Sequence, residues 1–250
     1  MKNIFNFIFI GIIQGITEFL PISSSGHIVL FGSLFKLDNL MLISIVAHIG
    51  TLFAVLFCYR KRIAEIIRHP VKDKTFLHLI IATIPSIIIV LIFNSFLEDN
   101  FSTKSLVWGF IISAILLLVA DFKKESVKPI TKRSAVYMGI SQGLALLPGI
   151  SRSGSTLTCG LLVGVNKNEA LDFSFLMSIP IIIASAVYES FKLIKYQISI
   201  NFLGIFIVML TSFIFGILSI KLMLKTIKKN RLYYFSIYLV VLSLILVIFY

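Results

Sequence analysis

Residues 14–27 read Gln14-Gly-Ile-Thr-Glu18-Phe-Leu-Pro21-Ile-Ser-Ser-Ser-Gly-His27, a polar stretch with apolar residues on both sides. Proline, glycine and three consecutive serines break the helical pattern near the middle of the apolar region 3–36. At membrane depth, non-helical backbone is tolerated only where it is buried in protein or lines a wet cavity. We therefore expect residues 3–36 to form a re-entrant helix pair that enters a membrane, turns and leaves on the same side.

The composition of the whole chain supports a membrane setting. Of 250 residues, 58% are hydrophobic and 14% are charged, whereas soluble domains have about 45–50% apolar and about 25% charged residues. The net charge of +12 comes largely from basic runs just beside apolar stretches, as in juxtamembrane loops, so membrane lipid and not nucleic acid is the expected partner. No polar linker divides the chain, and we expect one membrane domain over residues 1–250.

Apolar stretches and charged loops predict the topology. A span needs about 20 mostly apolar residues, and six stretches qualify: 40–59, 76–97, 104–121, 171–191, 202–221 and 232–250. A second broken region, 135–165, is expected to form another re-entrant pair. Basic residues concentrate in three loops that we place in the cytoplasm, and they are sparse in the alternating loops 97–104 and 192–201; the basic loops are 60–74, 122–133 and 221–231.

The two broken regions resemble each other. Gln14-Gly15 recurs 128 positions later as Gln142-Gly143, and Ile22-Ser-Ser-Ser-Gly26 recurs as Ile150-Ser-Arg-Ser-Gly154. Three expected spans separate the copies, so the copies have opposite orientations, and polar turns of such repeats meet near the midplane. The predicted fold class is an all-α polytopic membrane protein with six transmembrane helices and two re-entrant hairpins in an inverted-topology repeat (repeat 1 about 1–122; repeat 2 about 130–250).

The first polar turn carries candidate binding groups. Gln14 and Glu18 are four residues apart and share one helical face, and an ionisable residue inside a membrane is a functional candidate. The serines Ser23 to Ser25 offer hydroxyls and free backbone N–H groups at the start of the next helix, where anions bind. The alternative is a capping serine cluster with a glutamate at the wet end of a helix.

The second turn carries Arg152, which lies inside an apolar region, unlike the other basic residues. A buried guanidinium needs an anionic partner, and its planar fork suits phosphate oxygens. Gly149 and Gly154 let backbone approach a ligand closely. A structural ion pair with Glu18 is the alternative, and it is compatible with a site that holds the pair when empty. Together the turns offer the groups that phosphoryl transfer uses.

These motifs resemble the undecaprenyl-diphosphate phosphatase family, the bacitracin-resistance membrane phosphatases. The resemblance extends over nearly the whole chain and rests on Gln14-x-x-x-Glu18, Pro21–His27 and Pro148–Gly154. It implies hydrolysis of the C55 isoprenoid diphosphate to the monophosphate, which recycles the carrier lipid for cell-wall synthesis. It also implies a divalent cation, Mg²⁺ or Ca²⁺, and a multi-pass protein of the plasma membrane; a homodimer is compatible with it.

On this basis we assign hypothetical roles. Glu18 with Gln14 would ligate the cation or position water, and Arg152 would hold the diphosphate. Ser24 would be the nucleophile if a phospho-enzyme forms, with His27 handling the proton; direct attack by water is the other route, and the sequence leaves both open. The remaining substrate-binding candidates are Ser23, Ser25, Ser151, Ser153 and Gly154.

Two positions depart from the family pattern. Gln14 stands where many members have glutamate, which implies weaker metal binding. His48 stands where relatives commonly have glutamine, and we interpret His48 as a packing residue.

A lipid-phosphate transporter is the main rival function, because inverted repeats with broken helices are typical of transporters. Histidine-dependent acid phosphatases need a histidine well after the Ser-Arg element, and the chain has none beyond His78.

Overall fold

The computed structural model describes residues 2–35, 37, 40–99, 103–123, 126–195 and 202–249, which form eleven α-helices. Within these residues the β-structure is confined to one isolated bridge between Lys128 and Val165, which confirms the all-α prediction. Four helices are long and apolar enough to cross a membrane: α3 (Leu40–Cys58), α5 (Lys74–Asp99), α9 (Lys167–Lys195) and α10 (Phe202–Ile227). The other two expected spans coincide with the shorter apolar helices α6 (Thr103–Asp121) and α11 (Tyr233–Phe249).

The chain forms two helix pairs where the sequence is broken. The first comprises α1 (Lys2–Phe19) and α2 (Ser24–Leu34), and the second α7 (Lys132–Leu144) and α8 (Arg152–Leu162). The turn after α1 contains Pro21 and places Ser23 at a φ of 68°, and the turn after α7 contains Pro148 and places Gly149 at a φ of 83°. A positive φ is incompatible with a right-handed helix, so these residues keep the turn non-helical, and at Ser23 the side chain makes this conformation strained.

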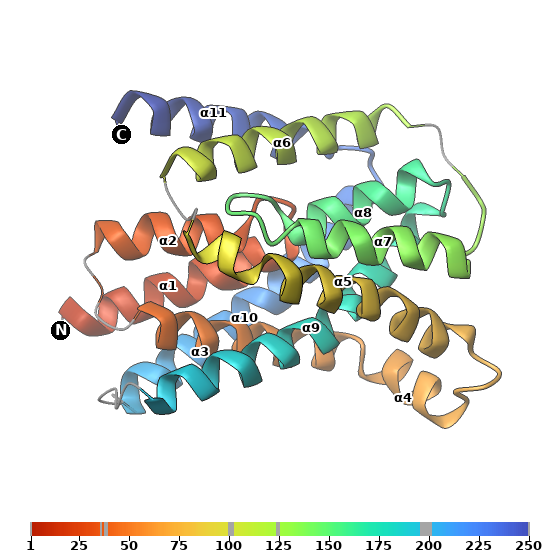
Figure 1. Cartoon of the computed structure of the whole chain (residues 1–250), viewed down its shortest axis with the longest axis horizontal. Helices are drawn as coiled ribbons and strands as arrows, with labels where there is room; N and C mark the ends of the chain where they lie inside the picture. Colours follow the sequence, from red (N-terminus) through yellow and green to blue (C-terminus); the bar gives the residue numbers. More distant parts are fainter. Residues whose placement is uncertain are drawn as a thin grey trace.

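Positions 128 residues apart make similar helix contacts. The helix α1 packs on α10, and α7 packs on α5. Glycines allow both close approaches: a Cβ on Gly11 would lie 2.8 Å from the Val208 carbonyl oxygen, and a Cβ on Gly139 would lie 2.1 Å from the Ala82 carbonyl oxygen. Each glycine is followed four residues later by another, the spacing of close membrane helix pairs. Further pairs are α3 with α9 and α6 with α11, and the latter two lie side by side along one edge in Figure 1.

Two segments differ from the expected loops. The predicted loop 60–74 contains a nine-residue helix, α4 (Arg60–Arg68), whose apolar residues and charged residues fall on opposite faces. A short amphipathic helix of this kind suits the interface of a membrane with water. The helix α10 continues to Ile227, beyond the expected end of its span. Residues 100–102 and 196–201 of the two predicted basic-poor loops lie outside the described residues, and the sidedness of the loops stays a prediction.

Large apolar side chains cover the outside as well as the core. Phe19 and Phe175 are fully buried and meet edge to face with ring centroids 5.4 Å apart, which fixes the end of α1 against α9. By contrast Leu91, Trp108 and Ile248 are each at least 66% exposed. Exposed apolar surface on most of the long helices would associate in water. The described helices therefore belong to a membrane protein.

Candidate active site

The tips of the two helix pairs are the residues around their turns, 18–27 in the first pair and 148–154 in the second. They meet in the structure, as the sequence predicted. Arg152, the first residue of α8, forms an ion pair through its Nη2 with Oε1 of Glu18, near the end of α1. The Ser153 hydroxyl donates a hydrogen bond of 3.1 Å to the Leu20 carbonyl oxygen. A Cβ on Gly154 would lie 3.1 Å from Cβ of Pro21, so the tips are in close contact. Two charges that are 134 residues apart in the chain thus share one buried site.

Glu18 is the centre of this cluster. It is 6% exposed, and its Oε2 accepts hydrogen bonds of 3.0 Å from the Gln14 amide and 2.6 Å from the Ser24 hydroxyl. The spacing of four residues on α1 brings Gln14 beside Glu18, and the turn at 20–23 brings Ser24 back over it. Because a buried carboxylate needs charge-assisted partners, this arrangement keeps Glu18 ionised.

Two atoms of the cluster lack partners. Gln14 Oε1 and Arg152 Nη1 are buried and, within the described part of the chain, form no hydrogen bond. An unpaired buried polar group destabilises the fold by about 1–3 kcal/mol, and more if it is charged. One of these atoms is an acceptor and the other a cationic donor, so a ligand that carries both anionic oxygens and either protons or a cation would satisfy both. These two atoms are the strongest sign of a binding site.

Both tips begin a helix with a capping serine. The Ser23 hydroxyl accepts from the Gly26 N–H at 3.4 Å, and the Ser151 hydroxyl accepts from the Gly154 N–H at 3.1 Å. The positive ends of α2 and α8 therefore lie at the cluster, which favours an anion there. Ser25 is exposed and lies 3.5 Å from the Ser23 hydroxyl. Binding of phosphate oxygens by these serines stays a prediction.

His27 has other partners than the expected ones. Its Nδ1 is 2.7 Å from the Ser23 carbonyl oxygen, which can only accept, so Nδ1 donates and Nε2 accepts from the Tyr238 hydroxyl at 2.6 Å. The ring also stacks on Tyr238 with centroids 5.7 Å apart. These contacts attach the first tip to α11. The Ser24 hydroxyl that His27 was expected to serve donates instead to Glu18, and a role of His27 in proton transfer stays a prediction.

His48 joins the cluster, although we interpreted it as a packing residue. Its Nε2 lies 3.7 Å from Oε2 of Glu18, and its Nδ1 donates to the Ser44 carbonyl oxygen at 2.8 Å. Its side chain is 30% exposed, unlike the 5% of Glu18, so it lies between the carboxylate and the outside. A signal was present in the sequence, because a histidine inside a span is a functional candidate by default.

The cluster offers few metal ligands. No group of three or more His, Cys, Asp and Glu that could hold a metal ion occurs among the described residues. The available oxygens are the Glu18 carboxylate and the unpartnered Oε1 of Gln14. Magnesium is commonly held by one or two carboxylates with water and substrate phosphates supplying the rest. The residues present fit a cation of that kind, bound together with a phosphate-bearing substrate.

An apolar groove runs beside the second tip. It has a volume of about 640 Å³ and lies between α6, α7 and α8, with Leu116, Ile140 and Ile150 among its lining residues. Ile150 directly precedes Ser151 and Arg152 in the chain, so one end of the groove lies near the second turn. Ser155, one helical turn after Arg152, also lines it, and its buried hydroxyl has no partner among the described residues.

Comparison with known proteins shows the family of this chain. The model of the family described as bacitracin resistance protein BacA matches residues 7–245. The chain belongs to this family. The BacA relatives include proteins named undecaprenyl-diphosphatase from Borreliella burgdorferi (strain ZS7), 38% identical over 100% of this chain and 99% of the relative, and from Carboxydothermus hydrogenoformans, 36% identical over 98% and 97%. A relative of the same name from Macrococcus caseolyticus is 35% identical over 96% of this chain and 93% of the relative.

Proposed function

We propose that this protein hydrolyses undecaprenyl diphosphate to undecaprenyl phosphate and inorganic phosphate, which recycles the carrier lipid for cell-wall synthesis. The carrying observation is the pair of unpartnered buried atoms, Arg152 Nη1 and Gln14 Oε1, beside the ionised Glu18. The names of the BacA relatives support the same activity. They do not favour the transporter that the inverted repeat had suggested.

Arg152 would bind the terminal phosphate. One of its two terminal nitrogens already pairs with Glu18, and the other, which has no partner among the described residues, would donate to a phosphate oxygen. The positive N-terminal ends of α2 and α8 add to the positive electrostatic potential around Arg152. As the bond between the terminal phosphorus and the bridging oxygen breaks, negative charge grows on the departing lipid monophosphate and on the transferred group. Donors already in place stabilise that charge without reorganisation.

Glu18 would accept the proton of the nucleophile. Ser24 donates to Glu18 across 2.6 Å, so the carboxylate can take the hydroxyl proton as Oγ forms a bond to phosphorus and lipid monophosphate leaves. Water would then attack the phospho-serine, releasing inorganic phosphate and returning the proton to Oγ. In the alternative route Glu18 takes a proton from a water that attacks the terminal phosphorus directly. Both routes consume one water and use the same base.

A divalent cation fits this proposal. Glu18 and Gln14 would hold it together with phosphate oxygens of the substrate, and when bound it would neutralise part of the charge that develops on those oxygens. Magnesium and calcium share this preference for oxygen ligands. With Gln14 in place of a second carboxylate, we expect the protein alone to bind the cation weakly and the substrate complex to bind it more tightly.

We also propose the finer topology on which this site depends. Six membrane spans and two re-entrant pairs of opposite orientation, in one domain with repeats about 1–122 and 130–250, would place the tips within the bilayer. The matching contacts of Gly11 and Gly139 support this arrangement. A substrate made of membrane lipid and used in cell-wall synthesis supports location in the plasma membrane. A homodimer stays a prediction.

The groove beside the second tip would hold the start of the isoprenoid chain. Its lining is mostly apolar and includes Ile150 and Ser155, which flank Arg152 in the chain, where the diphosphate would lie. A chain that lies in this groove would remain buried from water while its phosphates reach the tips. Leu116 from α6 and Ile140 from α7 would contact it from two sides.

The decisive experiment is a phosphate-release assay on the purified protein. We expect release from the C55 diphosphate, slower release from shorter isoprenoid diphosphates, and loss of release with a chelator that Mg²⁺ or Ca²⁺ restores. Glu18→Gln, which keeps the size of the side chain and removes its charge, should abolish release. Transfer of labelled lipid across vesicles without phosphate release would contradict the proposal and favour the transporter.

A further inference from the structure

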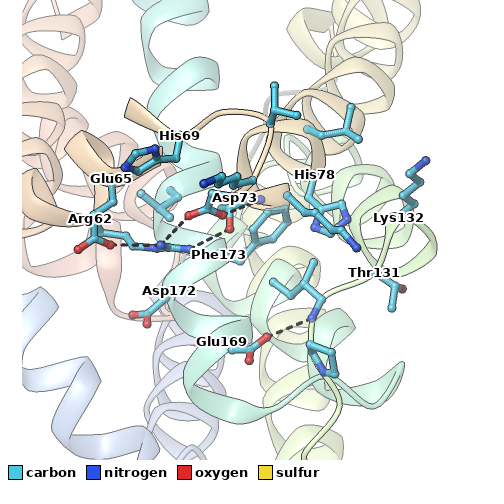
Figure 2. Close-up of a pocket in the computed structure, with 18 residues that line it drawn as sticks. Arg62, Glu65, His69, Asp73, His78, Thr131, Lys132, Glu169, Asp172 and Phe173 are labelled. Carbon is cyan, nitrogen blue, oxygen red and sulfur yellow. Dashed lines mark hydrogen bonds and ion pairs between the residues drawn. The ribbon is translucent and has the colours of Figure 1, made fainter. Parts of the chain in front are cut away.

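A second cavity lies apart from the charged tips, where α4 faces the first turns of α5, α7 and α9. Its volume is about 1340 Å³, and Figure 2 shows its lining. None of its lining residues belongs to the Glu18 cluster. In Figure 1 α4 lies at the opposite end of the molecule from the N-terminus. The cavity is built from the ends of the helices α5 and α9 and an amphipathic helix, and therefore belongs to the interface of the membrane with water.

Each acidic side chain of this cavity already has a partner. Arg62 forms ion pairs of 2.7 Å with Asp73 and 3.3 Å with Glu65, and Figure 2 draws this group on one side. Burial acts to raise the pKa of Asp73, but hydrogen bonds from Thr75 and the charge of Arg62 lower it below the usual value. The other two acids accept hydrogen bonds: Glu169 from the Ile130 N–H at 3.1 Å and Asp172 from the Tyr59 hydroxyl at 2.6 Å.

The lysine side chains that line this cavity are not neutralised by the described residues. Among the described residues Lys72, Lys74 and Lys132 form no ion pair, and all three line the cavity. His78 lines it too and is 7% exposed, yet no described residue forms a hydrogen bond or an ion pair with its ring. Figure 2 shows His78 and Lys132 together, across the cavity from Arg62. An anion would complete this set.

The backbone adds to the positive field. The helix α5 begins at Lys74 after Asp73, and α7 begins at Lys132 after its capping residue Thr131. The Thr75 N–H of α5 already donates to Asp73 and the Ser134 N–H of α7 to Thr131. The remaining N–H groups of the first turns and the helix dipoles make such ends favourable for anions. One space is therefore enclosed by the starts of two helices, the lysine at each start and a buried imidazole. Phosphate, with several strongly accepting oxygens, can bond to groups on different sides at once.

The remaining lining is apolar and includes Leu77, Phe173 and Leu176. The cavity is far larger than a phosphate ion, and its apolar wall suits hydrocarbon. We propose that this cavity binds a phosphate group through Lys74, Lys132 and His78, supplied by the headgroup of an anionic phospholipid or by free inorganic phosphate. Bound there, the phosphate connects α4 and α5 with α7, the helix that leads to the second tip.

The test is lipid binding to the purified full-length protein by native mass spectrometry in detergent. Phosphatidylglycerol and phosphatidylcholine are titrated separately, and inorganic phosphate is then added in excess. The test variant is Lys74→Gln with Lys132→Gln. The matched control is Lys225→Gln with Lys229→Gln, which removes the same charge from basic residues that do not line the cavity. Each lysine near an anionic headgroup contributes about fivefold in affinity, so both contribute about 25-fold.

We expect the test variant to bind phosphatidylglycerol about 25-fold more weakly and the control to bind it as the parent does. Displacement by inorganic phosphate would identify free phosphate as a ligand, and resistance would identify the lipid. Equal affinity of the test and control variants for phosphatidylglycerol would overturn the proposal. Equal binding of the two lipids by the parent, without displacement by inorganic phosphate, would overturn it as well. Phosphate release from the C55 diphosphate should persist in both variants, so failure of this site and failure of the proposed function are distinguishable.

Discussion

Replacing Arg152 with lysine keeps the positive charge and removes the fork. One terminal nitrogen of Arg152 pairs with Glu18, and the other is buried and has no hydrogen-bond partner among the described residues. A lysine ammonium can pair with Glu18, but it has no second group that reaches the position of Nη1. The substrate phosphate then has one hydrogen-bond donor fewer to stabilise its developing negative charge. Removal of one such preorganised donor costs about 2.7–4 kcal/mol, or roughly 10²–10³ in kcat.

We therefore expect Arg152→Lys to lower kcat for phosphate release from the C55 diphosphate by roughly 10²–10³, with a much smaller effect on KM. Lysine is more informative than alanine, because alanine would leave Glu18 as an unpaired buried charge, at a cost of about 3–5 kcal/mol in stability. The control is Arg60→Lys, since Arg60 is exposed. Among the described residues its guanidinium donates to the Phe57 carbonyl oxygen alone, and it lies over the Phe57 ring.

The measurement is steady-state phosphate release by purified parent, test and control proteins, with the thermal unfolding midpoint of each in the same detergent. Arg60→Lys should leave kcat unchanged, and both variants should unfold near the parent temperature. A kcat for Arg152→Lys within about fivefold of the parent would refute the reasoning that a second guanidinium nitrogen binds the phosphate.

Three further predictions concern the same site. Ser24→Ala should lower kcat by at least about 10³ if Ser24 attacks phosphorus, since Glu18 then lacks the nucleophile it deprotonates; a loss of only about tenfold, without a trapped phospho-enzyme, would favour water. Tyr238→Phe should lower unfolding stability by about 1 kcal/mol through the lost bond to His27, and an unchanged denaturation midpoint would contradict that contact. Ile140→Trp should raise KM for the C55 diphosphate but not for a short-chain diphosphate; equal effects on both would exclude the groove as the chain site.

The sequence predicted the centre of the site because the relevant signals are local. Glu18 and Arg152 stand out as charges inside apolar regions, and each is followed or preceded by residues that break a helix. Similarity between the two copies then requires the tips to face each other. The same local logic predicted the position of every long apolar helix, since the required length and the charge-free stretch can both be read from the chain.

Contacts between distant elements could not be predicted in this way. His27 follows a serine cluster, and a motif of that kind suggests a partnership with Ser24, but the rotation of α2 directs the ring to Tyr238, 211 residues away. His48 was undervalued because nothing in its neighbourhood on α3 shows that α1 packs there. The helix α4 was missed because its charge density resembles a loop, although its apolar residues recur with helical spacing.

Because the two tips face each other, the charge of the residue on one tip restricts the charge that the other can carry. If both tips carried the same charged residue, two carboxylates or two guanidinium groups would lie opposite each other in a buried space. The like charges would then repel. The opposite signs of Glu18 and Arg152 turn that repulsion into attraction. Each tip therefore contributes one sign of charge, and the buried pair depends on residues from both halves of the chain.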